Sequence, residues 1–258
     1  MPTSRRILTF NEYAALRHPT PYVVDVAGEG SRLVLFGGRH SSDPADSMFD
    51  QIEAAFAALG PAFALHEGTP PAAEPDREIA IRRHCETGLI RYLAARAGIA
   101  TASMDIPLAE EARLLRAEIG PAEALVFLVV RQLASFNRKT ARPNFDAYFG
   151  DFFDLIAPGL NLSVDWPLIE TEHRRILGRS LSADHVTAIE TDPMRDDLPT
   201  QRVARLSNRL RDEHMLRRLI AAVEDHRRLF ATVGVTHAVM LEPAIRAAIE
   251  GPLEGESR

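Results

Sequence analysis

Short apolar runs alternate with helical segments along most of this chain, and this alternation constrains the fold more than any other feature. Because a turn at 27–31 (AGEGS) joins the first two apolar runs, we expect a hairpin there. Strands that alternate with helices are typical of a central, largely parallel or mixed sheet flanked by helices, so the sequence predicts an α/β fold. The strands are expected at 22–26, 33–36, 62–65, 99–104 and 228–233. The helices are expected at 48–59, 76–97, 200–226 and 244–250.

The middle of the chain has a different pattern, because helical segments follow one another there without strands between them. We interpret roughly 108–180 as a helical insertion or cap within a single α/β domain that spans 1–258. Beyond the insertion, HVTAI at 185–189 predicts one more short strand. The helices of the insertion are expected at 109–119, 122–140, 145–156 and 168–177.

Charge and composition restrict the class of partner. The formal net charge is −6 with both signs interspersed, whereas general nucleic-acid binders are usually basic. The longest apolar run, 124–130, is too short to span a bilayer, and the N-terminal residues lack the continuous apolar region of a signal peptide. The one cysteine, Cys85, allows neither an intrachain disulfide nor a cysteine-based zinc site. We expect a cytoplasmic protein with a small-molecule substrate and neither a nucleic-acid nor a membrane partner; the oligomeric state is left open.

The same Gly-x-x-His motif closes two of the expected strands, one near each end of the chain. LVLFGGRH (33–40) ends at His40, and ATVGVTH (231–237) ends at His237. If the two strands lie close together in one sheet, both histidines project from the edge formed by the carboxyl ends of the strands. Active sites of open α/β sheets form at that edge.

A carboxylate is expected at the same edge. Glu67 follows the strand at 62–65, while alternation sends its neighbour His66 to the other face of the sheet. Two imidazoles and a carboxylate can activate water in two ways. They can bind a divalent metal that lowers the pKa of a bound water, or one of them can act as a general base while another group holds the water.

These motifs, in this order, resemble the superfamily that groups erythromycin esterases, TraB/TIKI-type proteins and ChaN-like proteins. LRDEHML (210–216) adds to the resemblance because it is similar to the Arg-Asp-x-x-Met helix that precedes the last Gly-x-x-His strand of that family. The resemblance spans roughly 30 to 245, although the middle helices match only in type. It implies that His40, Glu67, Arg211 and His237 line the site.

Members of the superfamily differ in what they do, and each kind implies a different function here. In esterase-like members the first histidine and a glutamate are thought to activate water. In TIKI-like members the corresponding groups, here His40, Glu67 and His237, bind a divalent metal such as Mn²⁺ or Zn²⁺ and cleave peptides. ChaN-like members are linked to haem, which implies a non-catalytic haem or small-ligand binding protein. A biosynthetic enzyme acting on a specialised metabolite is a further alternative.

This chain departs from the family pattern next to its first histidine. Many esterase- and ChaN-like members carry a glutamate two or three positions before that histidine, where this chain has Gly37 and Gly38. The expected site is therefore one carboxylate poorer, and Arg39 can make it one guanidinium richer. A guanidinium favours a substrate that bears a carboxylate or a phosphate.

The reaction that these residues predict is hydrolysis of an ester, amide or related acyl bond. His40 is the expected general base, Glu67 orients it or the water, and His237 is a second base or holds the oxyanion. Arg211 is expected to bind the substrate or developing negative charge. Asp43 is a candidate for binding substrate, with the N-cap of the following helix as its alternative role. The chain has no Gly-x-Ser-x-Gly and no nucleotide-binding glycine motif, so nothing indicates a serine hydrolase or a nucleotide site.

Overall fold

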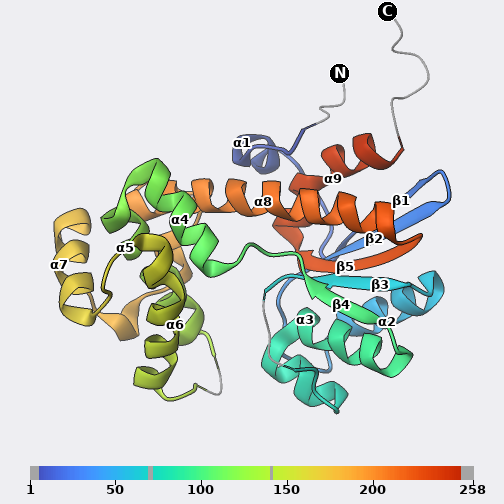
Figure 1. The fold of residues 1–258 in the computed structure, drawn as a ribbon, viewed down its shortest axis with the longest axis horizontal. Helices are drawn as coiled ribbons and strands as arrows, with labels where there is room; N and C mark the ends of the chain where they lie inside the picture. Colours follow the sequence, from blue (N-terminus) through green and yellow to red (C-terminus); the bar gives the residue numbers. More distant parts are fainter. Residues whose placement is uncertain (1–5, 69–71, 140–141, 251–258) are drawn as a thin grey trace, which may run out of the picture. The chain divides into compact units, whose positions relative to one another are not determined.

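The structure, a computed structural model, describes residues 6–68, 72–139 and 142–250 and shows the predicted α/β fold (Figure 1). The chain divides into two compact units, Met1–Asp105 together with Asp212–Arg258, and Ile106–Arg211. The second unit contains the helices expected in the insertion and extends beyond 180. Within the described ranges no helix is both long enough and apolar enough to cross a membrane.

The first unit is built on a five-stranded sheet in the order β1-β2-β5-β3-β4. β1 pairs with β2 as the expected antiparallel hairpin, and all other neighbours in the sheet are parallel. Because β5 lies between β2 and β3, the two strands that end in Gly-x-x-His are adjacent, as the site requires. The strands are β1 (Tyr22–Gly28), β2 (Ser31–Gly38), β3 (Phe63–His66), β4 (Ala100–Ser103) and β5 (Arg228–Gly234).

Helices cover both faces of this sheet, which explains why its strands read as continuous apolar runs. On one face Phe36 and Phe230 pack with α2 (Met48–Leu59) and α3 (Arg77–Ala97). On the other face Leu35 packs with α9 (Val235–Ile249) and with the part of α8 (Pro199–Asp225) that belongs to this unit (Figure 1). A short helix, α1 (Phe10–Ala14), precedes β1.

α3 contains a kink that its sequence pattern does not predict. The helix begins after Asp76, whose side chain accepts a hydrogen bond from the Ile79 N–H, and then leaves helical geometry at His84 and at Cys85, where φ is 50°. The kink brings the Ala80 carbonyl so close to residue 88 that a Cβ atom there would lie 2.0 Å from it, so residue 88 must be glycine. The kink therefore sets the direction of the residues after it, beginning with Glu86.

The second unit is helical. Its core is α5 (Pro121–Asn137), which is apolar almost all round. An ion pair between the half-buried Arg131 and the buried Glu111 joins α5 to α4 (Leu108–Ile119). The Ser207 hydroxyl donates a hydrogen bond to the same glutamate at 2.6 Å. The elements are α4 (Leu108–Ile119), α5 (Pro121–Asn137), α6 (Phe145–Leu160), α7 (Trp166–Leu177), two short 3₁₀ helices η1 (Ala183–His185) and η2 (Ala188–Thr191), and the first part of α8.

Two expectations about secondary structure are wrong. The segment 185–189 is not a strand but joins η1 to η2, because the Asn137 side chain binds the Ala183 and Val186 carbonyls and Thr187 caps η2. The last helix begins at Val235 and not at 244, because α9 follows β5 directly with Gly234 as its N-cap. His237 therefore lies in the first turn of a helix instead of in a loop.

Candidate functional site

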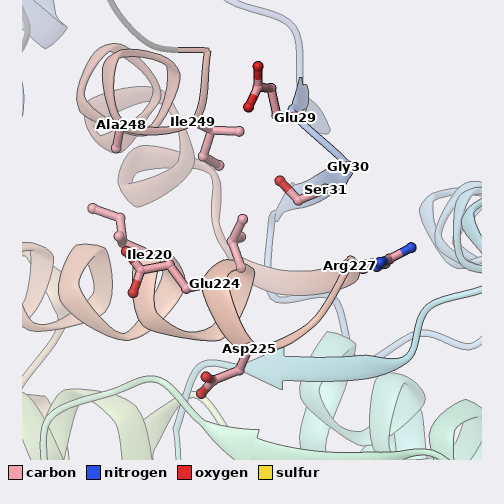
Figure 2. A pocket seen from close by; sticks show the side chains of 10 residues that line it. Glu29, Gly30, Ser31, Ile220, Glu224, Asp225, Arg227, Ala248 and Ile249 are labelled. Carbon is pink, nitrogen blue, oxygen red and sulfur yellow. The ribbon is translucent and has the colours of Figure 1, made fainter.

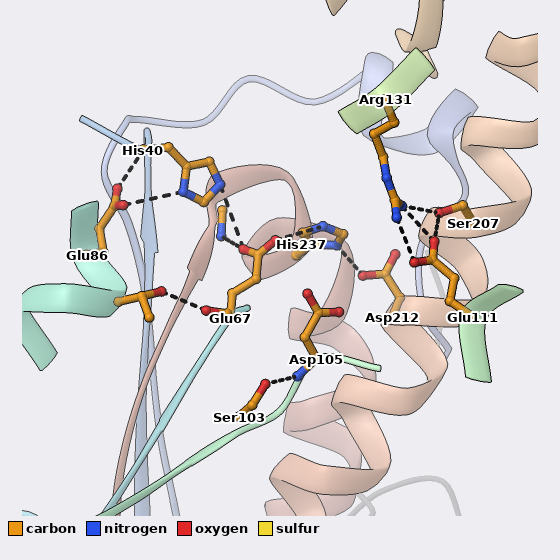
Figure 3. A network of polar contacts seen from close by, with 12 residues as sticks. His40, Glu67, Glu86, Ser103, Asp105, Glu111, Arg131, Ser207, Asp212 and His237 are labelled. Atoms are coloured by element: carbon orange, nitrogen blue, oxygen red, sulfur yellow. Dashed lines mark hydrogen bonds and ion pairs between the residues drawn. The ribbon is translucent and has the colours of Figure 1, made fainter. Parts of the chain in front are cut away.

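The carboxyl ends of β2, β5 and β3 meet at one edge of the sheet, and three of the predicted site residues lie together there (Figure 3). They are His40 beyond β2, Glu67 beyond β3 and His237 beyond β5. Each imidazole presents its Nε2 atom to the Glu67 carboxylate, at 3.8 Å for His40 and 3.9 Å for His237. A single carboxylate thus lies between the two histidines.

His40 is held by its backbone and leaves its ring accessible. Its φ of 55° is in the left-handed region, which non-glycine residues rarely adopt. Its N–H donates to Glu86 Oε1 at 2.6 Å, and its carbonyl accepts from Cys85 Sγ at 3.5 Å. The side chain is 57% exposed, so it can reach a substrate.

Glu86 is a site residue that the sequence motifs do not indicate. It is buried, it comes directly after the kink in α3, and its Oε2 lies 3.4 Å from His40 Nδ1. Gly38 makes room for it, because a Cβ atom at that position would lie 2.1 Å from Glu86 Oε1. α3 therefore supplies a carboxylate beside the histidine of the first Gly-x-x-His motif. The paired glycines are the sequence signal for a close approach, but they do not indicate the partner.

Glu67 is fixed at both its backbone and its side chain. Its carbonyl accepts from the Thr87 hydroxyl at 2.7 Å, and its Oε2 accepts from the Gly234 N–H at 2.8 Å. The absence of a side chain at Gly234 matters here, since a Cβ atom would lie 2.8 Å from His40 Nε2. The first glycine of the second motif therefore leaves space for the histidine of the first motif.

His237 is the buried counterpart of His40. Its side chain is 9% exposed, and its Nδ1 lies 2.5 Å from Oδ1 of Asp212, which is completely buried. The sequence motifs do not indicate a role for Asp212 either, although it stands inside the Arg-Asp-x-x-Met motif next to Arg211. The resemblance pointed to the arginine of that motif, whereas the structure brings its aspartate to the histidine.

The two predicted arginines, Arg39 and Arg211, interact electrostatically with carboxylates that do not belong to the His40–Glu67–His237 group. Arg211 belongs to the second unit. There burial acts to raise the pKa of Glu111, but Arg131 and then Arg211 bring it below its usual value. Arg39 pairs with Asp46 and holds the pKa of that carboxyl at about 2. The substrate-binding roles of Arg39 and Arg211 stay predictions.

Asp43 does not cap α2. The N-cap of that helix is Ser47, whose side chain makes no capping hydrogen bond, and the Met48 N–H donates to Asp46 Oδ1 at 2.9 Å. Asp43 instead accepts from the Ala45 N–H at 3.1 Å and stabilises the turn before the helix. Its predicted contact with substrate stays a prediction.

His66 is the last residue of β3, and its side chain is buried. Burial, and after it the nearby Arg91 charge, lower its pKa to about 4. Its register partner Thr232 is buried on the same face. Asp105 follows β4 at the edge that carries the site, and its N–H donates to Ser103 Oγ at 3.1 Å. His66 is thus a neutral core residue, whereas Asp105 adds an acidic group to the edge.

A site could also be indicated by a cluster of metal-binding side chains or by a pocket elsewhere in the described residues. Nowhere in 6–68, 72–139 and 142–250 do three His, Cys, Asp or Glu side chains come together in an arrangement that could hold a metal ion. A pocket of about 600 Å³ lies at the opposite edge of the sheet, beside the β1–β2 turn (Figure 2). It is lined by Glu29, Ile220, Glu224, Arg227 and Ile249 among others, and by none of the predicted site residues.

Comparison with protein-family models, with curated proteins and with solved structures gives no match for this chain. The resemblance to the esterase, TIKI and ChaN superfamily therefore stays a prediction based on the motifs. Any proposal about the reaction therefore rests on the arrangement of the site residues alone.

Proposed function

We propose that this protein is a hydrolase that activates water at the His40–Glu67–His237 edge and cleaves an ester, amide or related acyl bond of a small molecule in the cytoplasm. One observation carries the proposal: two imidazoles face a single carboxylate with their Nε2 atoms, and each has a further carboxylate at its Nδ1 atom. That arrangement orients two proton-transfer groups toward the same small space.

His40 is the general base in this proposal. With a carboxylate at Nδ1, the ring proton is favoured on that nitrogen, so that Nε2 keeps its lone pair. The 3.8 Å between Nε2 and Glu67 Oε2 is too long for a hydrogen bond and leaves both atoms within reach of one shared water. The water oxygen attacks the acyl carbon while its proton passes to His40, and the leaving group takes that proton when its bond to the acyl carbon breaks.

His237 holds the negative charge that develops on the acyl oxygen. Asp212 is completely buried, and a buried carboxylate requires a compensating positive group or hydrogen bonds. The adjacent imidazole supplies that compensation best when it is protonated, and its Nε2–H then donates to the oxyanion. The two histidines therefore have different roles, one as base and one as hydrogen-bond donor.

The metal-dependent form of the reaction is the second candidate. A carboxylate behind each imidazole favours it, because histidines that bind metals usually donate their other ring N–H to such a group. Within the described part of the chain, the side chains of His40, Glu67 and His237 are not arranged so that all three could hold one metal ion. We therefore derive no step through a metal.

The test is a screen of small esters and amides with the purified protein and with His40→Gln, accompanied by metal analysis of both. We expect hydrolysis that falls at least about 100-fold in the variant, as loss of a general base requires, and that survives chelator. His185→Gln, at an exposed histidine of the second unit, is the matched control and should keep the activity. Equal hydrolysis by wild type and His40→Gln contradicts the proposal, whereas stoichiometric metal that is lost in the variant favours the metal-dependent form.

A further inference from the structure

We propose that Glu86 is the positioning residue that fixes both the backbone and the ring tautomer of His40. The inference deepens the proposed function and rests on it only for its catalytic consequence. The positioning itself is a property of the folded protein.

Glu86 contacts His40 at two points. Its Oε1 accepts the His40 N–H at 2.6 Å, which holds the residue in its left-handed backbone conformation. Its Oε2 lies 3.4 Å from the ring Nδ1. One carboxylate therefore restrains the main chain and the side chain of the same residue.

The charge of Glu86 selects one tautomer of the ring. A lone pair on Nδ1 would face a buried negative charge, whereas a proton there faces an acceptor. Among the described residues no hydrogen bond reaches Glu86 Oε2, and a buried carboxylate oxygen without one carries a desolvation cost. A proton on His40 Nδ1, 3.4 Å from Oε2, places positive partial charge beside this carboxylate oxygen and leaves Nε2 as the base that faces Glu67.

The surrounding chain is shaped to deliver this carboxylate. Glu86 follows the kink at His84 and Cys85, and Cys85 also binds the His40 carbonyl. Gly38 leaves the space that the carboxylate fills, because a Cβ atom there would lie 2.1 Å from Oε1 and 2.7 Å from the carboxyl carbon. The φ of Gly38 is not in the left-handed region, so space and not backbone conformation requires glycine at this position.

The first experiment records the ¹⁵N signals of the His40 ring in wild type, Glu86→Gln and Glu86→Ala. We expect the neutral ring of wild type to carry its proton on Nδ1. In Glu86→Gln the amide can still accept the His40 N–H while its NH₂ group faces Nδ1, so the ring should change to the Nε2–H tautomer. Glu78→Gln, on the exposed face of the same helix, should leave the ring signals unchanged.

The second experiment is a double-mutant cycle with Gly38→Ala, which tests the geometry without altering Glu86. The added methyl group must displace the carboxylate, and Glu86→Ala removes it, so we expect each of these single substitutions to release the ring from the Nδ1–H tautomer. In the Glu86→Ala background the same substitution should have no further effect. An Nδ1–H tautomer that persists in Glu86→Gln and in Gly38→Ala overturns the inference.

Activity separates this inference from the proposed function. Once a substrate is identified, Glu86→Gln should lower kcat at least about tenfold while changing KM little, since it misplaces a base without altering substrate contacts. A tautomer change without any hydrolysis in wild type supports the positioning role and removes the proposed function. Hydrolysis by wild type, together with a tautomer that the Glu86 and Gly38 substitutions leave unchanged, supports the proposed function and removes the positioning role of Glu86.

Discussion

The two Gly-x-x-His motifs have the same form in the sequence but different structures. In the first motif, His40 lies in a loop with a left-handed backbone conformation, and its side chain is 57% exposed. The carboxylate of Glu86 lies 3.4 Å from its ring. The second places His237 in the first turn of α9 with a side chain that is 9% exposed, and its carboxylate lies 2.5 Å from the ring. The same spacing therefore produces one accessible histidine and one buried histidine.

The two motifs differ because the chain takes a different path after each glycine. After Gly234 the chain enters a helix at once, so His237 is buried against the body of the unit. After Gly38 the chain continues as a loop until Met48, and Glu86 holds His40 there. An exposed base and a buried hydrogen-bond donor suit the two roles that we propose.

The largest effect that would sharpen this comparison is on stability. Asp212→Asn should lower the free energy of unfolding by about 3 kcal/mol, because it removes one partner of a fully buried pair. Glu86→Gln should cost about 1 kcal/mol, because its partner ring is half-exposed and an amide still accepts the His40 N–H. Urea unfolding of both variants measures the two values, and equal losses would show that the two pairs are energetically equivalent.

A third histidine beside this edge, His66, is buried in the core and predicts a pH effect. Its pKa is lowered to about 4 by burial, whereas in the unfolded chain it is about 6.5. Between these pH values the unfolded chain binds a proton that the folded chain does not. The protein therefore has its full stability with respect to this group above about pH 6.5, and it loses on the order of 2–3 kcal/mol as the pH falls toward about 4.

The measurement for His66 is urea unfolding of wild type and His66→Gln at several pH values between neutral and the lowered pKa of about 4. Because glutamine does not titrate, the variant should lose less stability over that range than wild type. The same loss in both proteins would mean that His66 is not held neutral. Exposed His185, replaced in the same way, serves as the control, since its ring is not in the core.

The smallest effect has opposite signs at the two motifs. At position 40 the left-handed φ of 55° favours glycine, so His40→Gly should be more stable than His40→Ala by about 1 kcal/mol. At position 237 the helical backbone favours alanine, so His237→Ala should be more stable than His237→Gly by about 0.5–1 kcal/mol. Thermal unfolding of the four variants checks the signs, and the same sign at both positions would contradict the difference between the motifs.

The sequence predicts much of the fold because the local patterns agree with the tertiary structure. The hairpin, the strand order in the chain and α2 with its Gly60 stop all follow from apolar runs and turn residues. The strand prediction for 185–189 is wrong because the side-chain amide of Asn137, a residue far away in the chain, binds the Ala183 and Val186 carbonyls. Local periodicity cannot detect such a contact.

The site is predicted only where its residues stand beside strand ends. His40, Glu67 and His237 follow three strands closely, and the sheet brings them together. Glu86 and Asp212 come from helices, where a buried acidic residue has the same local pattern as an exposed one. Only the kink in α3 and the packing of α8 turn them toward the histidines. Although Asp212 stands in the Arg-Asp-x-x-Met motif, the motif does not show which of its side chains reaches a histidine.

Glu67 lies between the two histidines and faces both, and the proposed chemistry depends on this arrangement. The most direct test is to record the ring ¹H and ¹⁵N signals of His40 and His237 in wild type, in Glu67→Gln and in Glu78→Gln as an exposed control. We predict that Glu67→Gln changes the ring signals of both histidines, since its carboxylate lies 3.8 Å and 3.9 Å from their Nε2 atoms, while the control changes neither. A change confined to one histidine, or to neither, would contradict the shared site.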